Sequence, residues 1–94
     1  MQILAISELT KNSTLENVTP HIAQEVRDTL GLHLKDVIRS FYFQSEGNGV
    51  VFMMECDSVE AARSELDNLI LVKNGIAQFR LIPLEPLRPL GMLL

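Results

Sequence analysis

The sequence predicts a single α+β domain with the element order strand, helix, strand, strand, helix, strand. Two apolar, alternating segments flank a Glu-Gly-Asn-Gly reversal at residues 46–49, and Asn-Gly is the strongest short-range hairpin signal. Helix-start signals precede two segments with apolar residues at helical spacing. Strand-like alternation recurs at both ends of this region. The order is that of a ferredoxin-like βαββαβ unit with a four-stranded antiparallel sheet.

The N-terminal third contributes one strand and one helix. Residues 2–9 alternate loosely and are predicted to form the first strand, followed by a polar connector over residues 10–19. Thr19 offers a hydroxyl at the N-cap and Pro20 tolerates the first helical position, so the helix is expected to begin there. Its buried face is predicted from i+4 spacing to carry Ile22, Val26, Leu30 and Leu34.

The central hairpin, residues 37–45 and 50–56, has apolar side chains on both of its faces. One face carries Val37, Phe41, Phe43, Phe52, Met54 and Cys56, and the other carries Ile38, Tyr42, Val51 and Met53. An antiparallel sheet needs only one apolar face. The chain has helices enough to cover one face, so a second copy is expected to cover the other. The sequence therefore predicts a homodimer or higher homo-oligomer built as a dimeric α+β barrel.

The C-terminal third contributes the second helix, the last strand and an unusual tail. A capping-box pattern from Asp57 to Glu60 predicts the helix start, and the final strand is predicted over residues 76–84. The buried stripe of the helix is predicted to be Val59, Ala62, Leu66 and Leu69. Residues 1–84 thus form the domain, and residues 85–94 form an apolar arm with two prolines. The arm either folds back over its own sheet edge or crosses to a partner subunit.

Composition excludes several classes of protein. The 94 residues carry a net charge of −4 with scattered Lys and Arg, so no nucleic-acid partner is expected. No apolar run approaches the ~20 residues that span a bilayer, and the start lacks signal-peptide features, which predicts a cytoplasmic protein without a membrane partner. The one cysteine excludes an internal disulfide framework. No residues have metal-ligand spacing, and no glycine-rich phosphate loop or catalytic triad is recognisable, so neither metal nor cofactor is expected.

Three segments resemble one known family. They are Ile-Arg-Ser-Phe-Tyr at residues 38–42, Cys-Asp-Ser-Val-Glu-Ala at residues 56–61, and Leu-Ile-Leu at residues 69–71 before the last strand and proline-containing tail. Over roughly its C-terminal two-thirds, the chain resembles the muconolactone isomerase-like branch of the dimeric α+β barrel superfamily. The resemblance implies two ferredoxin-like protomers packed sheet to sheet, with pockets between each sheet and its helices. Members of this superfamily include isomerases, cofactor-free monooxygenases and haem-degrading enzymes.

Five residues are candidates for site chemistry. Arg39 is predicted on the face of Phe41 and Phe43, where it either anchors a substrate carboxylate or reaches solvent or a helix acid. Glu55, on the other face with Ser40 and Tyr42, is either a general base beside these substrate-binding candidates or an interface contact. His33, among leucines, either shuttles a proton, ligates a haem or lies at the surface.

Three functions remain open from the sequence. The first is a cofactor-independent, muconolactone isomerase-like proton shift on a small carboxylated substrate, with Arg39 holding the anion and His33 or Glu55 moving the proton. The second is a non-catalytic protein that binds a small ligand, such as an anion, or that serves in assembly. The third is a haem-binding or monooxygenase-like relative.

Overall fold

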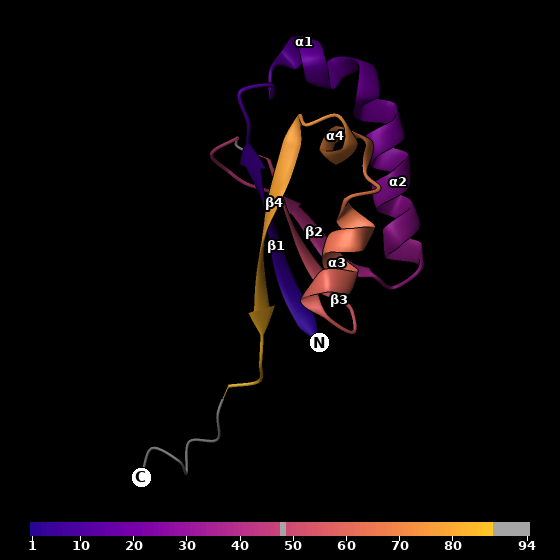
Figure 1. Cartoon of the computed structure of the whole chain (residues 1–94), viewed down its shortest axis with the longest axis vertical. Helices are drawn as coiled ribbons and strands as arrows, with labels where there is room; N and C mark the ends of the chain where they lie inside the picture. Colours follow the sequence, from indigo (N-terminus) through magenta and orange to yellow (C-terminus); the bar gives the residue numbers. More distant parts are fainter. Residues whose placement is uncertain (48, 88–94) are drawn as a thin grey trace.

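The computed structural model describes residues 1–47 and 49–87, and it has the predicted ferredoxin-like fold. The chain runs through β1 (Gln2–Leu9), α1 (Leu15–Val18), the 3₁₀ turn η1 (Thr19–His21), α2 (Ile22–Leu34), β2 (Ile38–Phe43), β3 (Val50–Glu55), α3 (Val59–Leu66), α4 (Ile70–Lys73) and β4 (Ala77–Leu84). All strand pairs are antiparallel, in the order β2-β3-β1-β4 (Figure 1). Most of the predicted arm, residues 88–94, lies outside the described residues.

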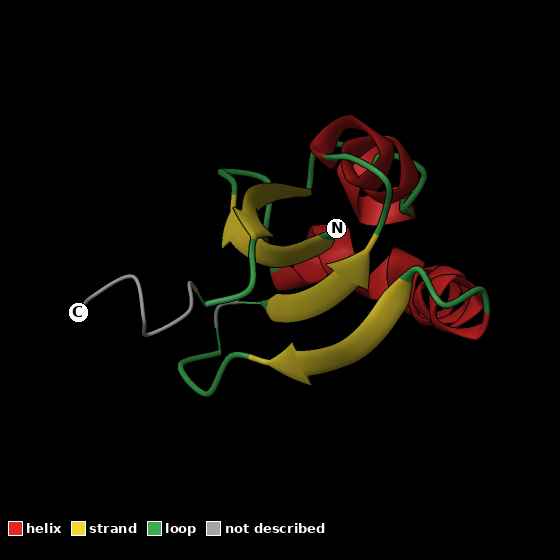
Figure 2. Ribbon diagram, turned by 90° about the horizontal axis from the view of Figure 1, so that it is seen from below, coloured by secondary structure: helices red, strands yellow, loops and turns green. Residues whose placement is uncertain are grey.

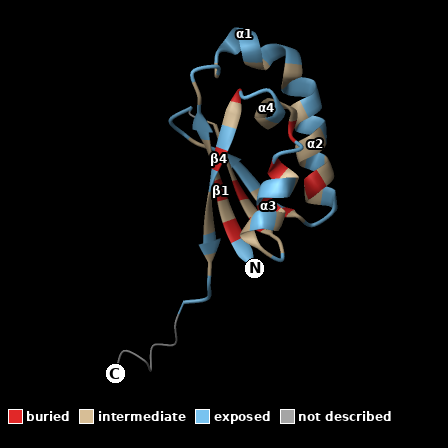
Figure 3. Ribbon diagram, viewed as in Figure 1, coloured by how far each residue is buried: buried red, intermediate tan, exposed pale blue. Residues whose placement is uncertain are grey.

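The helices lie on one face of the sheet, and the core lies between the two layers (Figures 2 and 3). The sheet contributes buried Ile3, Ala5, Phe52, Met54 and Phe79, and the helices and their connections contribute Leu32, Ala62, Leu66 and Leu69. The rings of Phe52 and Phe79 stack with centroids 5.4 Å apart. Three of the four residues predicted for the stripe of the second helix are thus confirmed as core.

The opposite face of the sheet has an apolar centre with polar residues such as Arg80 and Glu55 around it, and no helix among the described residues covers it. Leu4 pairs with Met53 on one side and with Ile82 on the other, and Ile6 pairs with Val51. These five side chains are half-buried, because neighbouring strands shield them but no second layer does. The expectation that both faces of the central hairpin are apolar is therefore confirmed.

A β-bulge changes which side chains of β2 face the core. Ile38 pairs with Met54 and Ser40 pairs with Met53, so Arg39 is an extra residue on β2. Ile38 is consequently fully buried beside Met54. The prediction that Ile38 shares a face with Tyr42 was wrong, because strict alternation does not hold across a bulge.

Two helix starts also differ from the predicted ones. The helix predicted to begin at Thr19 is α2, which begins at Ile22 after the 3₁₀ turn η1, and its N-cap His21 makes no side-chain capping hydrogen bond. Thr14 caps the separate short helix α1, where its hydroxyl accepts a hydrogen bond from the Asn17 amide at 3.1 Å. Thr19 instead donates to the Leu15 carbonyl at 2.6 Å. At α3 the N-cap is Ser58, which accepts from the Ala61 amide at 3.0 Å, rather than Asp57. At α1 and α3 a hydroxyl side chain satisfies an otherwise unpaired amide of the first turn.

Candidate functional site

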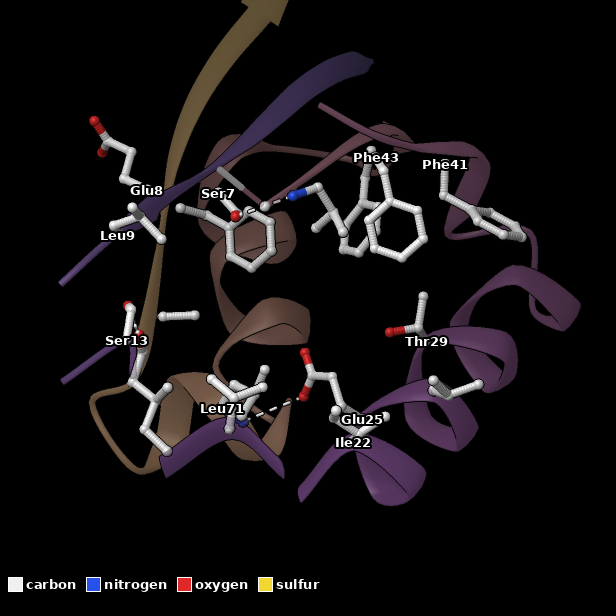
Figure 4. Close-up of a pocket in the computed structure, with 18 of the residues that line it drawn as sticks. Ser7, Glu8, Leu9, Ser13, Ile22, Glu25, Thr29, Phe41, Phe43 and Leu71 are labelled. Carbon is white, nitrogen blue, oxygen red and sulfur yellow. Dashed lines mark hydrogen bonds between the residues drawn. The ribbon is translucent and has the colours of Figure 1, made fainter. Parts of the chain in front are cut away.

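A cavity of about 760 Å³ lies between α2 and the helix-facing side of the sheet (Figure 4). Its volume falls within the range of small-molecule sites. The sheet supplies aromatic walls from three strands, and α2 supplies the facing aliphatic side chains. The principal apolar lining residues are Phe41, Phe43, Phe52, Phe79, Ile22, Val26 and Leu30.

The cavity exists because α2 buries only one residue. Leu32 packs into the core, whereas Ile22, Val26 and Leu30 remain 46%, 52% and 45% exposed. The sequence predicted these three to be packed against the sheet, and Leu34 with them; that prediction was wrong for the single chain. The first three line the cavity instead, and Leu34 is exposed. The space between this apolar face of α2 and the sheet leaves room for a ligand.

Glu25 is the acidic side chain that α2 brings to this cavity. Its Oε1 accepts a hydrogen bond from the Leu71 amide at 3.2 Å, and its other oxygen points into the cavity (Figure 4). Burial raises the pKa of Glu25 above its ordinary value, and the charge of Asp28 adds to the rise. The Leu71 and Ile70 amides and His21 act in the opposite direction on this pKa. Glu25 is therefore a held carboxyl group whose ionised form is disfavoured.

A second polar group lies one helical turn beyond Glu25. Thr29 lines the cavity and directs its hydroxyl into it (Figure 4). Ser7 lies across the cavity on β1, where its hydroxyl accepts from the Val50 amide at 3.2 Å. Among the described lining residues there is no Lys, Arg or His, and the acidic ones are Glu8 and Glu25. The site thus pairs extensive apolar walls with a few hydroxyl groups and a carboxyl group.

The predicted arginine anchor lies outside this lining. Arg39, on the β2 bulge, has its Nη1 3.6 Å from Oδ1 of Asp36, and its side chain is 55% exposed. Ser40 follows on the outer face of the sheet, opposite Met53. Tyr42 is counted in the lining, but its side chain is largely exposed and its strand partner is Val51 on the outer face. The three substrate-binding candidates are therefore not gathered around one point.

The two predicted proton-transfer residues, His33 and Glu55, also lie outside the cavity lining. The Nδ1 of His33 is 2.7 Å from the Ile38 carbonyl oxygen, so this nitrogen carries the proton and donates. The His33 ring meets the Phe41 ring edge-on, with centroids 5.1 Å apart, behind the cavity wall. Glu55 ends β3, where its carboxylate pairs with the Met1 ammonium group at 2.6 Å.

The sequence analysis missed Glu25 as a site residue. Residue 25 follows Ile22 by three positions and precedes Thr29 by four, so it lies along the apolar stripe of α2. A lone carboxylate on such a stripe was the available signal. Because the residues beside it in sequence, Gln24, Val26 and Arg27, include two polar ones, this signal is easily taken for part of a solvated face. The structure also describes no group of three or more His, Cys, Asp or Glu arranged for a metal within residues 1–47 and 49–87.

Comparison with known proteins shows similarity to a solved structure. No family model matches the chain, and no curated protein matches it. The solved structure of 5-chloro-2-hydroxyhydroquinone dehydrochlorinase (TftG) from Burkholderia phenoliruptrix AC1100, in complex with 2,5-dihydroxybenzoquinone, superposes with a TM-score of 0.73. The match covers 90% of this chain and 94% of TftG at 17% sequence identity. The two chains share a fold.

This match supports the fold predicted from sequence without identifying a particular family. The muconolactone isomerase-like resemblance is not specifically supported by it. Within the described part of the chain, no helix has the length and apolar character needed to cross a bilayer.

Proposed function

We propose that the cavity binds a small, planar, enolisable or hydroxylated ring compound and that Glu25 moves a proton on it. The observation that carries this proposal is the Glu25 carboxyl group, held by the Leu71 amide and facing a cavity with apolar walls. A proton-transfer residue needs a pKa near the working pH, and burial moves the pKa of Glu25 in that direction. The proposed reaction class is a cofactor-independent isomerisation.

The proton shift conserves atoms and electrons. The Glu25 carboxylate removes a proton from a ring carbon or hydroxyl group of the bound molecule, leaving an enolate. The resulting carboxylic acid then returns a proton to a different carbon or oxygen of the same molecule. The product is an isomer, and Glu25 ends in its starting form. The hydroxyl group of Thr29, on the same helix and directed into the cavity, is our candidate to hydrogen-bond the enolate oxygen.

The lining favours a ring compound over a small carboxylated one. Phe41, Phe52 and Phe79 offer aromatic surfaces for offset or edge contacts with a ring. A carboxylate placed here would meet Glu25 without a lining cation among the described residues to offset the repulsion. The 2,5-dihydroxybenzoquinone bound by TftG is a planar hydroxylated ring, which makes it a suitable first probe at a pH low enough to keep its acidic hydroxyl groups protonated, since its anion would meet the same repulsion from Glu25. Arg39 as a carboxylate anchor remains the competing proposal, and it requires a substrate that reaches the β2 bulge.

The test is hydrogen exchange on 2,5-dihydroxybenzoquinone in D₂O, followed by loss of its ring-proton NMR signal. The wild-type chain should accelerate exchange, and Glu25→Gln should lower that acceleration by about 10²-fold or more while the quinone still binds. Glu16→Gln, an exposed site on α1 with the same chemical change, is the matched control. Binding without any acceleration in wild type would indicate a non-catalytic ligand-binding protein. No binding would overturn the proposal.

We also propose that two copies pack through the outer face of the sheet. The support is the continuous apolar surface of Leu4, Met53 and Ile82, which no described helix covers. A second sheet with the same surface is self-complementary about a two-fold axis. Packing of this kind would leave each cavity on the helix side of its own sheet.

A further inference from the structure

We propose a second binding site, for a small polyanion, in a groove on the other side of α2. This groove has a volume of about 410 Å³ and lies between α2 and the α3–α4 segment. It shares none of its lining residues with the apolar cavity. Three α2 residues, Gln24, Asp28 and Gly31, and the C-cap residue Lys35 lie along one face of the helix over about 16 Å, at 1.5 Å rise per residue.

Positive charge is concentrated in this groove. Arg27, Lys35 and Lys73 line it, three of the eight Lys and Arg residues in a chain of net charge −4. Within the described residues, none of the three has a carboxylate oxygen within 4.0 Å; the ion pairs found there involve other groups. Three such cations around one depression repel one another, and a bound anion would offset that repulsion.

Two acids, Asp28 and Glu65, also line the groove, so three cations and two carboxylates give it a formal charge of +1. Asp28 accepts a hydrogen bond at 2.7 Å from the amide of Gln24, whose oxygen in turn accepts from Arg27 at 3.3 Å. Arg27 is therefore oriented by a neutral amide and keeps its remaining N–H donors for a ligand.

The composition of the groove favours a phosphoryl-type anion. Guanidinium and ammonium groups both bind phosphate oxygens, and the Asn68 side chain adds an amide donor. Gly31 leaves the floor open, since a Cβ built there meets no atom within 4 Å. The cations are exposed, so binding should weaken as salt is added. Inorganic pyrophosphate, a compact polyanion, is the probe of choice.

The experiment is isothermal titration calorimetry of the full chain with pyrophosphate at low and moderate ionic strength. Wild type should bind saturably, and Arg27→Gln and Lys73→Gln should each weaken binding about tenfold. The matched control is Lys11→Gln, an exposed lysine outside the groove, which should bind like wild type. Equal weakening by Lys11→Gln would reduce the effect to net charge and overturn the proposal. So would the absence of saturable heat in wild type.

Gly31→Met tests the same site without changing charge. Its side chain should fill the groove and abolish pyrophosphate binding, while helix propensity favours folding. The melting temperature of each ligand-free variant is measured in parallel. Variants that lower this temperature but bind pyrophosphate as wild type does would show that the cations serve only the helix ends. Quinone binding in the apolar cavity should be unchanged in Gly31→Met, which separates this site from the proposed function.

Discussion

At the residue scale, Glu25 shows how a small fold can retain a partly desolvated acid. Its helix neighbours Ile22 and Val26 face the cavity, so the carboxyl group lies beside apolar surface. The Leu71 amide supplies one hydrogen bond, which offsets part of the cost of burying the charged form. The fold thus tolerates Glu25, but ionisation of the Glu25 carboxyl group lowers the stability of the folded chain.

The first prediction concerns the pH dependence of this cost. The pKa of Glu25 in the folded chain is raised above the ordinary value of 4.5, so the fold favours the protonated form. The stabilisation is therefore fully present below that value and is lost as pH rises through the folded pKa. Urea unfolding of wild type and Glu25→Gln should show wild type losing stability relative to the variant between pH 4 and pH 8. A difference that stays constant, or changes in the opposite direction, would contradict the raised pKa.

The second prediction concerns Arg39. Its contact with Asp36 is a single exposed ion pair at 3.6 Å, of the kind that contributes about 0–1 kcal/mol. Arg39→Ala should therefore lower the free energy of unfolding by less than about 1 kcal/mol and leave quinone affinity unchanged. The melting temperature of the ligand-free variant reports its stability. The further shift on adding the quinone or a dicarboxylate reports binding. A quinone stabilisation that disappears in Arg39→Ala would return the arginine to the site.

At the element scale, strands were easier to predict than helix starts. The first strand was predicted over residues 2–9 and is observed there, because alternation and flanking polar residues agree. At the second helix start, Asp57 and Ser58 are adjacent candidate caps, and the first helix was predicted to start at Thr19, five residues after the Thr14 that caps α1. Sequence spacing cannot decide between such pairs; the choice depends on which residue takes extended backbone angles, as Thr14 and Ser58 do.

The third prediction tests the cap of α3. Ser58→Ala removes the acceptor for the Ala61 amide, so the free energy of unfolding should fall by about 1 kcal/mol. Asp57→Ala is the matched control, because Asp57 is exposed and precedes the cap. It should lower the free energy of unfolding by only about a few tenths of a kcal/mol. Urea denaturation of both variants compares them directly. An equal loss in the two variants would show that charge at the helix start, rather than the cap, stabilises α3.

The fourth prediction tests the β2–β3 hairpin. Gly49 has φ +118°, and a Cβ there would clash with the Ser7 hydroxyl oxygen on β1. Gly49→Ala should therefore destabilise the chain by more than about 1 kcal/mol. Gly31→Ala, where a Cβ meets nothing and the helix gains propensity, should instead stabilise it. Opposite signs in urea denaturation confirm the two environments, and equal signs contradict them.

At the scale of the whole molecule, the sequence predicted the fold, and the family resemblance implied a pocket between the sheet and its helices, but the sequence did not predict which residues line the cavity. Apolar residues on both faces of the central hairpin are a property of the sequence alone. The cavity depends on how far α2 lies from the sheet, which no local pattern encodes. The same stripe of Ile22, Val26 and Leu30 would be core in a closer packing. Glu25 could therefore be assigned to the site only once the helix was placed.

The fifth prediction concerns assembly. If copies pack through the outer face, Met53→Glu places two buried charges near the two-fold axis and should dissociate the dimer. Wild type should sediment as a dimer at micromolar concentration, and Met53→Glu as a monomer. Ala23→Glu, on the exposed surface of α2, is the control and should remain dimeric. A monomeric wild type would remove the sheet-to-sheet proposal without affecting the Glu25 site.

The bulge at Arg39 divides β2 into two short pieces whose inward and outward phases are set independently. The piece holding Ile38 is aligned by Met54, and the piece holding Phe41 is aligned by Phe52. Shortening the chain by this one residue would merge the pieces into an uninterrupted strand, with Ile38 still in the core and Phe41 still in the cavity wall. A single-residue deletion there should thus be tolerated. Deleting the residue between Phe41 and Phe43 would instead turn an aromatic side chain from the cavity wall to the outer face of the sheet.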